Sequence, residues 1–259
     1  MSKRLWIMFP GWCGLVMLAL YVVPALAQTE VKEKPPMYTY VADWQIPRAH
    51  WGEMSQANAA DKKILDKALA DGTIVGYGND ETVVHQPDGA THDDWWSSTS
   101  MAGLMKVLDQ FYASGNTSSP VLASATKHWD SIFVSRHYNW HSGSYKNGYT
   151  HESSYKLKAD ASDDAVELVS KQFVVPILEK LLADGAVVEY EIDTMAIHSD
   201  APGTFWIVYI AANPEGLDKA NAAVEAALKA QPFAGTAFGS MTESAAHRDE
   251  LIRGDGTFK

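Results

Sequence analysis

The feature that most constrains this chain is a short segment whose sequence occurs twice with small changes. Residues 69–77 read Leu-Ala-Asp-Gly-Thr-Ile-Val-Gly-Tyr, and residues 182–190 read Leu-Ala-Asp-Gly-Ala-Val-Val-Glu-Tyr, 113 positions later. The offset holds without a gap over positions 66–106, where 13 of 41 residues are identical. Unrelated sequences would share roughly two or three, so the chain contains an internal repeat. The repeat predicts a duplicated structural unit and does not by itself name a reaction.

Both halves predict the same order of elements. Apolar alternation and helical spacing give strand, helix, strand, strand, helix, strand, with Gly72 and Gly185 ending the first helix of each half. The ranges in the first half are about 38–46, 50–70, 73–78, 92–101, 103–113 and 131–140, and after a polar connection at 79–81 the second strand continues extended over 82–85. Those in the second half are 155–159, 163–183, 186–198, 204–213, 217–230 and 250–259. A second correspondence, His128/His247 and Asp130/Asp249 at an offset of 119, marks the start of the last strand in each half.

This order of elements predicts an α+β fold built from two tandem ferredoxin-like (βαββαβ) units. Helices cover one face of each sheet, so the two bare faces are expected to meet as a single-chain α+β barrel. In element order the chain resembles the dimeric α+β barrel superfamily. That superfamily includes monooxygenases of antibiotic biosynthesis and, in fused form, haem proteins related to chlorite dismutase. The resemblance covers nearly all of the chain after residue 37, but no catalytic motif of a named member is present.

The start of the chain predicts export. Residues 1–27 combine a basic start, an apolar run and Ala25-Leu26-Ala27, which is the pattern of a cleaved signal peptide. An uncleaved membrane anchor is the alternative. Residues 28–37 are expected to be a tether, 38–150 the first ferredoxin-like unit and 151–259 the second. Cys13, the only cysteine, lies in the signal segment, so the mature chain would have no disulfide and no thiolate. We expect a secreted or periplasmic protein.

The charge balance excludes some partners. The chain carries a formal net charge of −11, and removal of Lys3 and Arg4 with the signal peptide leaves 19 basic against 32 acidic residues. Nucleic acids and anionic membranes bind clustered Lys and Arg, so neither is an expected partner. A small-molecule ligand and self-association both agree with the sequence.

The two copies differ most in their third strand. Phe205, Ile207 and Tyr209 of the second copy correspond to His92, Asp94 and Trp96 of the first. A strand buried on both faces does not hold such polar groups unpaired. The first half therefore has either a solvated face or a polar, aromatic-lined cavity. The predicted ligand-binding residues are His92, Asp94, Trp96, Trp44, His137 and His141.

The last two residues come from an aromatic and histidine-rich segment, 136–141. Alternation places His137 and His141 on one face of a strand, where they could share a metal ion with Asp93 or Asp94. An aromatic connector between the two units is the simpler interpretation of the segment, because no close metal-ligand spacing is present. The sequence assigns no metal, no cofactor and no catalytic residue.

Three functions remain open. The first is an exported barrel that binds a small apolar or aromatic ligand in a first-half cavity. The second is a monooxygenase-like or haem- or metal-dependent oxidoreductase that uses His92, His137 or His141 as ligand or base. The third is a structural or partner-binding protein of the cell envelope.

Overall fold

The computed structural model describes residues 34–84 and 86–259. The predicted signal peptide and residues 28–33 of the predicted tether lie outside this part of the chain. Within the described part, no helix has both the length and the apolar character needed to cross a membrane.

Each half of the described chain contributes four strands, in the order that the repeat predicts. The first half contains β1 (Met37–Gln45), α1 (Trp51–Ala70), β2 (Gly76–Val84), β3 (His92–Ser98), α2 (Met101–Ser114), α3 (Pro120–Ala123) and β4 (Lys127–Trp140). The second half begins with β5 (Gly143–Lys156), followed by α4 (Ala165–Val169), a π-helical segment Ser170–Val174 and α5 (Val175–Ala183). It ends with β6 (Val187–Met195), β7 (Thr204–Ala211), α6 (Pro214–Ala230), α7 (Pro232–Met241) and β8 (Arg248–Phe258).

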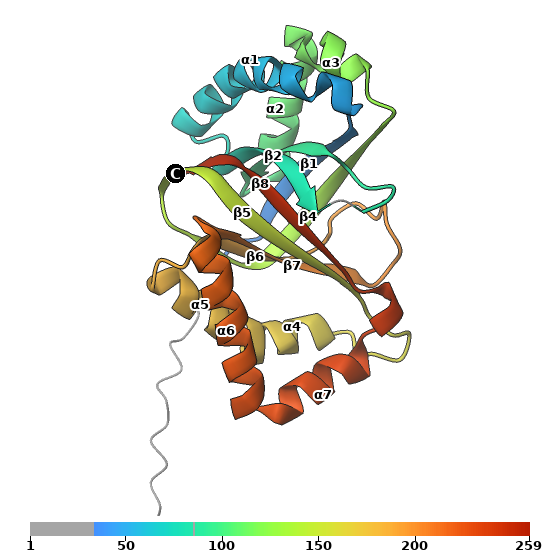
Figure 1. Ribbon diagram of the computed structural model, residues 1–259, viewed down its shortest axis with the longest axis vertical. Helices are drawn as coiled ribbons and strands as arrows, with labels where there is room; N and C mark the ends of the chain where they lie inside the picture. Colours follow the sequence, from blue (N-terminus) through green and yellow to red (C-terminus); the bar gives the residue numbers. More distant parts are fainter. Residues whose placement is uncertain (1–33, 85) are drawn as a thin grey trace, which may run out of the picture. The chain divides into compact units, whose positions relative to one another are not determined.

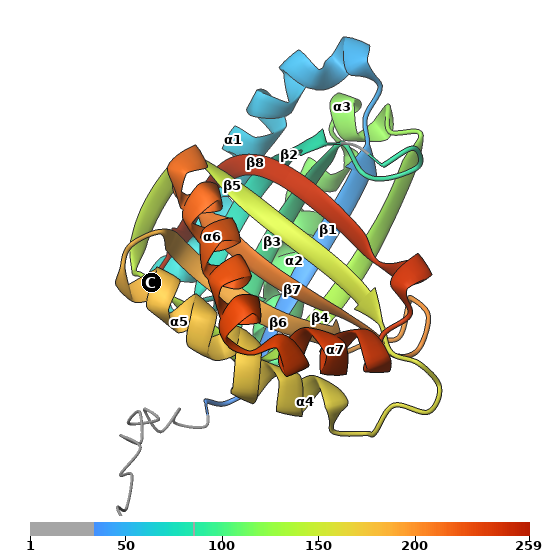
Figure 2. The ribbon, with the colours of Figure 1, turned by 60° about the horizontal axis from the view of Figure 1, so that its bottom comes forward.

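The eight strands close into one antiparallel barrel in the order β1-β3-β2-β8-β5-β7-β6-β4 (Figure 2). Each half supplies a four-stranded sheet, β4-β1-β3-β2 or β8-β5-β7-β6. The two sheets join edge to edge where β2 pairs with β8 and β4 pairs with β6. The predicted α+β barrel of two ferredoxin-like units is therefore confirmed. Closure gives every one of these eight strands a partner on both sides.

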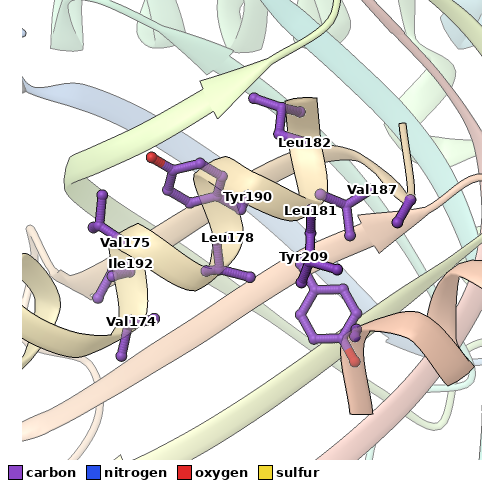
Figure 3. Packing of buried hydrophobic residues seen from close by; sticks show 11 residues of the cluster. Val174, Val175, Leu178, Leu181, Leu182, Val187, Tyr190, Ile192 and Tyr209 are labelled. Atoms are coloured by element: carbon purple, nitrogen blue, oxygen red, sulfur yellow. The ribbon is translucent and has the colours of Figure 1, made fainter. Parts of the chain in front are cut away.

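The helices lie outside the barrel in two groups. Figure 1 shows α1, α2 and α3 over the sheet of the first half and α4 to α7 over that of the second. Under the first group, Leu65, Ile74 and Leu104 are fully buried. Under the second, the apolar face of α5 packs on β6 and β7, with Leu178 and Leu182 in the same buried cluster (Figure 3). Each such side chain contributes about 1.5–3 kcal/mol by its burial.

Several repeated residues serve this architecture. Gly72 and Gly185 have φ angles of +78° and +67°, which lets the chain end α1 and α5 and turn toward the next strand. Gly103 and Gly216 lie in the first turns of α2 and α6. A Cβ at Gly103 would come within 2.7 Å of the carbonyl oxygen of Thr73, and one at Gly216 would collide with the carbonyl oxygen of Ala186. The repeat thus preserves turns and close backbone approaches.

The strand β5 differs most from its predicted range. The sequence predicts a strand over 155–159, but β5 occupies Gly143–Lys156, so the predicted unit boundary at 150/151 lies inside it. The chain turns directly from β4 into β5 through Gly143, which has a φ of +135°. The segment 143–154 is mostly polar, because its inward face lines a polar cavity, and it therefore lacks the apolar alternation that identifies a strand.

Candidate binding site in the barrel lumen

The barrel encloses a cavity of about 570 Å³, which we call the lumen. Alternation along each strand decides which side chains line it. On β3, Asp93, Trp95 and Ser97 line the lumen, and the residues between them face the helices. The lumen also reaches the connections β2–β3 and β6–β7, at the half-buried Gly89 and the exposed Asp200. We call this end of the barrel the mouth, because the cavity meets solvent there.

Aromatic side chains fill the opposite end of the barrel. Phe258 is 4 % exposed and packs against Trp95 and Trp140, with ring centroids 5.5 and 5.7 Å apart respectively. Tyr145 and Ile210 complete this buried cluster. Nearer the mouth, Trp206 meets Phe133 edge to face at 4.9 Å. The lumen is therefore a blind cavity with aromatic groups at its base and in its wall.

Carboxyl groups dominate the polar lining of the lumen. Six strands contribute eight of them, which we call the lumen carboxyls: Asp43, Asp80, Asp93, Glu152, Glu189, Glu191, Asp193 and Glu250. The basic side chains in the lining are Lys156 and Arg248, and both lie at strand ends near the mouth. No ion pair among the described residues includes a lumen carboxyl.

The lumen carboxyls lie opposite one another on neighbouring strands. Asp93 on β3 pairs with Asp43 on one side and with Asp80 on the other. In the second half, Glu152 on β5 lies opposite Glu250 on β8. Directly opposed residues of antiparallel strands are about 4.5–5.5 Å apart, and like charges at that separation destabilise a sheet. Some positive charge, either bound protons or a cation, must therefore compensate these groups.

Burial raises the pKa of all eight lumen carboxyls. The pKa of Asp43, Asp80 and Glu191 rises to about 7, and that of Glu152 to about 8. Burial is the largest cause in each case, and repulsion from Glu250 and Asp43 adds to the shift of Glu152. Protonated and ionised forms therefore coexist in the lumen near neutral pH.

Hydrogen bonds satisfy only part of this polar surface. Trp95 donates its indole N–H to Oδ2 of Asp80 at 3.0 Å, and Ser135 donates to Oε2 of Glu191 at 3.1 Å. In contrast, Oδ1 of Asp80, Oε1 of Glu189 and Oγ1 of Thr150 are buried without a partner in the described structure. Asp80 and Glu189 are only 5 % and 3 % exposed. Unpaired buried polar atoms are costly, and all three belong to residues that line the lumen.

The structure places the predicted residues of β3 on the outer face of its strand. Asp94 and Trp96 line a smaller pocket of about 160 Å³ between the first sheet and its helices, together with Trp44 on β1. Burial raises the pKa of Asp94 to about 7, and Asn79 donates a hydrogen bond to it. His92 contacts Trp51 edge to face at 5.3 Å. The structure brings three of the six predicted residues together, but outside the lumen, and their ligand binding stays a prediction.

His137 and His141, on and after β4, have separate partners. Nε2 of His137 lies 2.8 Å from Oε2 of Glu167, and Nε2 of His141 lies 2.7 Å from the carbonyl oxygen of Leu182. Neither lines the lumen, and the same holds for His92. The haem hypothesis relies on one of these three histidines as the iron ligand, so the residues that line the lumen do not fit a haem group.

The two repeated histidines occupy equivalent positions. Nδ1 of His128 lies 2.8 Å from the carbonyl oxygen of Asp43, and Nδ1 of His247 lies 3.0 Å from that of Ser154. Each ring also stacks on an aromatic side chain, His128 on Trp44 and His247 on Tyr155. Both histidines thus tie the start of a last strand to the end of a first strand, which is a structural role.

Most of the lumen carboxyls are not evident as site residues from the sequence. Glu189 and Glu191 alternate with apolar residues along their strand, a pattern that suits either acid–base chemistry or the solvent-exposed face of a sheet. Glu152 on β5 and Glu250 on β8 also occupy inward positions of polar strands, so the sequence shows the same ambiguous pattern there. Only the closed barrel shows that these strands share one cavity.

Comparison with known proteins identifies the fold. No protein-family model matches the chain, and no curated protein matches it. Among solved structures, a proposed monooxygenase of Fusobacterium nucleatum matches with a TM-score of 0.63 at 8% identity, covering 86% of this chain and 94% of that one. A proposed monooxygenase of Lactobacillus acidophilus matches with a TM-score of 0.59 at 12% identity, covering 85% and 94%. An anthrone oxidase-like protein matches at 0.50 with 9% identity, covering 86% and 92%. At these identities the likeness shows a shared α+β barrel fold.

Proposed function

We propose that the chain is a small-molecule-binding protein of the dimeric α+β barrel superfamily, fused into one chain, and that the lumen is its binding site. The observation that carries this proposal is the set of unpartnered buried atoms, on Asp80, Glu189 and Thr150, in the wall of a 570 Å³ cavity. Ligand pockets commonly have volumes of about 300–1,000 Å³ and combine apolar walls with a few convergent polar groups. The lumen has both properties.

Export is part of the proposal. The signal-peptide pattern in residues 1–27 supports a secreted or periplasmic protein that meets its ligand outside the cytoplasm. Expression of the full chain with N-terminal sequencing of the extracytoplasmic fraction tests this. We expect the mature chain to begin at Gln28, and a product retained in the cytoplasm with Met1 intact would contradict export. Self-association stays a prediction and is measured on the same product by light scattering.

The binding experiment uses two probes that differ in one group, naphthalen-2-ylmethanol and naphthalen-2-ylmethanamine, with calorimetry on the purified mature chain. At least one probe should bind with a stoichiometry of one. The variant Ser131→Trp puts an indole into the lumen lining and should abolish binding. The control Ser55→Trp adds the same group to the exposed face of α1 and should leave binding unchanged. Circular dichroism shows whether both variants fold, and Thr150→Phe provides a second lumen-filling variant. Binding that survives both lumen substitutions would overturn the proposal.

A second candidate function is cofactor-free oxygenation of an acidic aromatic substrate. The observation that favours it is Glu191, a lumen carboxyl with a pKa of about 7, which is suited to accept a proton at neutral pH. One solved neighbour is described as anthrone oxidase-like. Oxidation of anthrone by O₂ gives anthraquinone and water, and it begins with loss of a ring C–H proton. An oxygen electrode would record one O₂ consumed per anthrone above the uncatalysed rate, and Glu191→Gln should abolish the excess. No excess consumption would eliminate this candidate.

A further inference from the structure

We propose that the lumen binds an organic cation: a protonated primary or secondary amine with an aromatic or aliphatic body. This inference rests on the proposed function and names the class of its ligand. It follows from three independent features of the lumen, namely its charge, the distribution of its carboxyls and its aromatic wall.

The first feature is charge without internal compensation. Eight carboxyls from the strands line one cavity, besides Asp200 at the mouth, and the basic side chains of the lining, Lys156 and Arg248, are confined to the mouth. The guanidinium of Arg248 already forms hydrogen bonds with the backbone: its Nη1 donates to the carbonyl oxygens of Ala245 and His247 at 2.9 and 2.6 Å. With a neutral or anionic ligand, the opposed pairs Asp43/Asp93 and Glu152/Glu250 would depend on bound protons alone for compensation. A cationic ligand compensates them directly.

The second feature is how the carboxyls are distributed. They extend over six strands around the lumen wall, and among the described residues no three of the acidic, histidine or cysteine side chains are close enough to hold a metal ion. A single small ion needs several ligands at about 2.0–2.6 Å. An ammonium group needs no fixed set of ligands: one or two carboxylates at hydrogen-bond distance satisfy its charge, while its apolar body contacts the rest of the wall.

The third feature is the aromatic part of the lumen wall. Trp95, Trp206 and Phe133 line the same cavity as the carboxyls. Aromatic faces attract organic cations and also accept the apolar body of a ligand, which a hydrated metal ion would not use. When ionised, the carboxyls of Asp80 and Glu189 only accept hydrogen bonds, and a protonated amine only donates them. The lumen and a protonated amine are therefore complementary in hydrogen bonding as well as in charge.

The same pair of probes decides between ligand classes, because naphthalen-2-ylmethanamine is the cationic counterpart of naphthalen-2-ylmethanol. At pH 8 the amine should bind about tenfold or more tightly than the alcohol, as expected for a buried charge-assisted hydrogen bond. Glu152→Gln should remove about tenfold of the amine affinity and leave the alcohol affinity unchanged. The control Glu225→Gln removes an exposed carboxylate of α6 and should change neither.

The outcomes separate the two proposals. If neither probe binds in the lumen, the proposed function fails. If the alcohol binds as tightly as the amine and Ser131→Trp abolishes both, the lumen is a binding site but its ligand is not a cation, and this inference alone is overturned. Equal loss of both probes in Glu152→Gln would indicate general damage to the lumen. Glu250→Gln, which removes the opposed carboxyl, then provides the second test and should again reduce the amine affinity alone.

Discussion

Glu152 of β5 lies directly opposite Glu250 of β8 inside the barrel, and no basic side chain of the described residues forms an ion pair with either. Burial and mutual repulsion raise the pKa of Glu152 to about 8, whereas an unfolded chain would titrate Glu near about 4.3. The folded protein therefore holds protons that the unfolded chain has lost, and this difference makes its stability depend on pH.

The first prediction is that the free energy of unfolding falls as pH rises from about 4 towards 8. Below the unfolded pKa of the carboxyls, both states are protonated and the stabilisation is fully present. As the pH rises through the folded pKa, which is about 7 for Asp43, Asp80 and Glu191, the folded state also loses these protons and the stabilisation disappears. Each group contributes up to about 1.4 kcal/mol per pH unit in this window. Thermal denaturation at pH 5.5 and pH 8 measures the effect. Glu152→Gln should reduce the slope and raise the Tm at pH 8, and a Tm that increases from pH 5.5 to pH 8 in the wild type would contradict the pKa shifts.

The second prediction concerns protons released on binding. An amine that pairs with carboxylates lowers their pKa, so at pH 7 its binding to the lumen should expel protons from groups such as Glu191 and Asp43, whose pKa is about 7. Calorimetric titration in phosphate and in Tris, which have different ionisation enthalpies, should give different apparent enthalpies. Identical enthalpies in the two buffers at pH 7 would mean that the carboxyls do not titrate with the ligand.

The third prediction contrasts two adjacent acids. Asp93 and Asp94 are both buried on β3, but Asp93 lines the lumen and Asp94 lines the smaller outer pocket. Asp93→Asn should lower the amine affinity about tenfold, because it removes the carboxyl that lies between Asp43 and Asp80 and that a bound amine would ionise. If the sequence-predicted set around Asp94 binds the ligand instead, Asp94→Asn will show the loss and Asp93→Asn will not. Fluorescence titration of the two variants distinguishes these sites.

The fourth prediction tests the space that Asp80 needs. Gly254 of β8 lies opposite Asp80, and a Cβ at this glycine would overlap its Oδ1. Gly254→Ala should therefore destabilise the protein by about 1–3 kcal/mol in urea denaturation. The matched control Gly52→Ala has no atom within 4 Å of the new Cβ and lies in α1, so it should stabilise by up to about 1 kcal/mol. Equal effects of the two substitutions would show that Asp80 moves aside freely.

The fifth prediction separates fold from function at the repeated histidines. His128→Ala and His247→Ala each remove a hydrogen bond to backbone and a stacked ring, and each should cost about 1–3 kcal/mol of stability. Neither side chain lines the lumen, so the amine affinity of the folded protein should stay within about twofold of the wild type. A selective loss of amine binding in one variant at unchanged stability would give that histidine a role in the site.

The fold was predictable because both copies of the repeat keep the residues that the fold restricts most strongly to one position. Gly72 and Gly185 end helices, and the pairs Gly103/Gly216 and Asp80/Asp193 align the two copies without a gap. The glycines require a particular backbone or a close approach, so they persist in both halves and set the register. The start of β5 was not predictable from pattern, because polar residues on the inward face conceal the usual alternation of a half-buried strand.

The site was predictable only in part. The polar character of His92–Trp96 is visible in the sequence, but a strand has two faces and alternation alone does not say which one meets the helices. In the second copy both faces of the corresponding strand are apolar, so the comparison of copies does not decide it either. The predicted residues Asp94 and Trp96 face the helices, whereas Asp93 and Trp95 line the lumen. Barrel closure, which depends on pairing between distant strands, supplies the missing information.

The fusion of the two units into one chain has a consequence for recognition. A barrel made from two identical chains has a two-fold axis through its lumen, so any ligand would meet the same groups in either of two orientations. Here Glu189 and Glu191 stand where the first copy has Gly76 and Gly78, and Asp93 stands where the second has Trp206. Only Asp80 and Asp193 are equivalent lumen carboxyls under the alignment of the copies at positions 66–106. Duplication within one gene product has thus allowed the two walls to diverge, and an asymmetric molecule would bind in one orientation only.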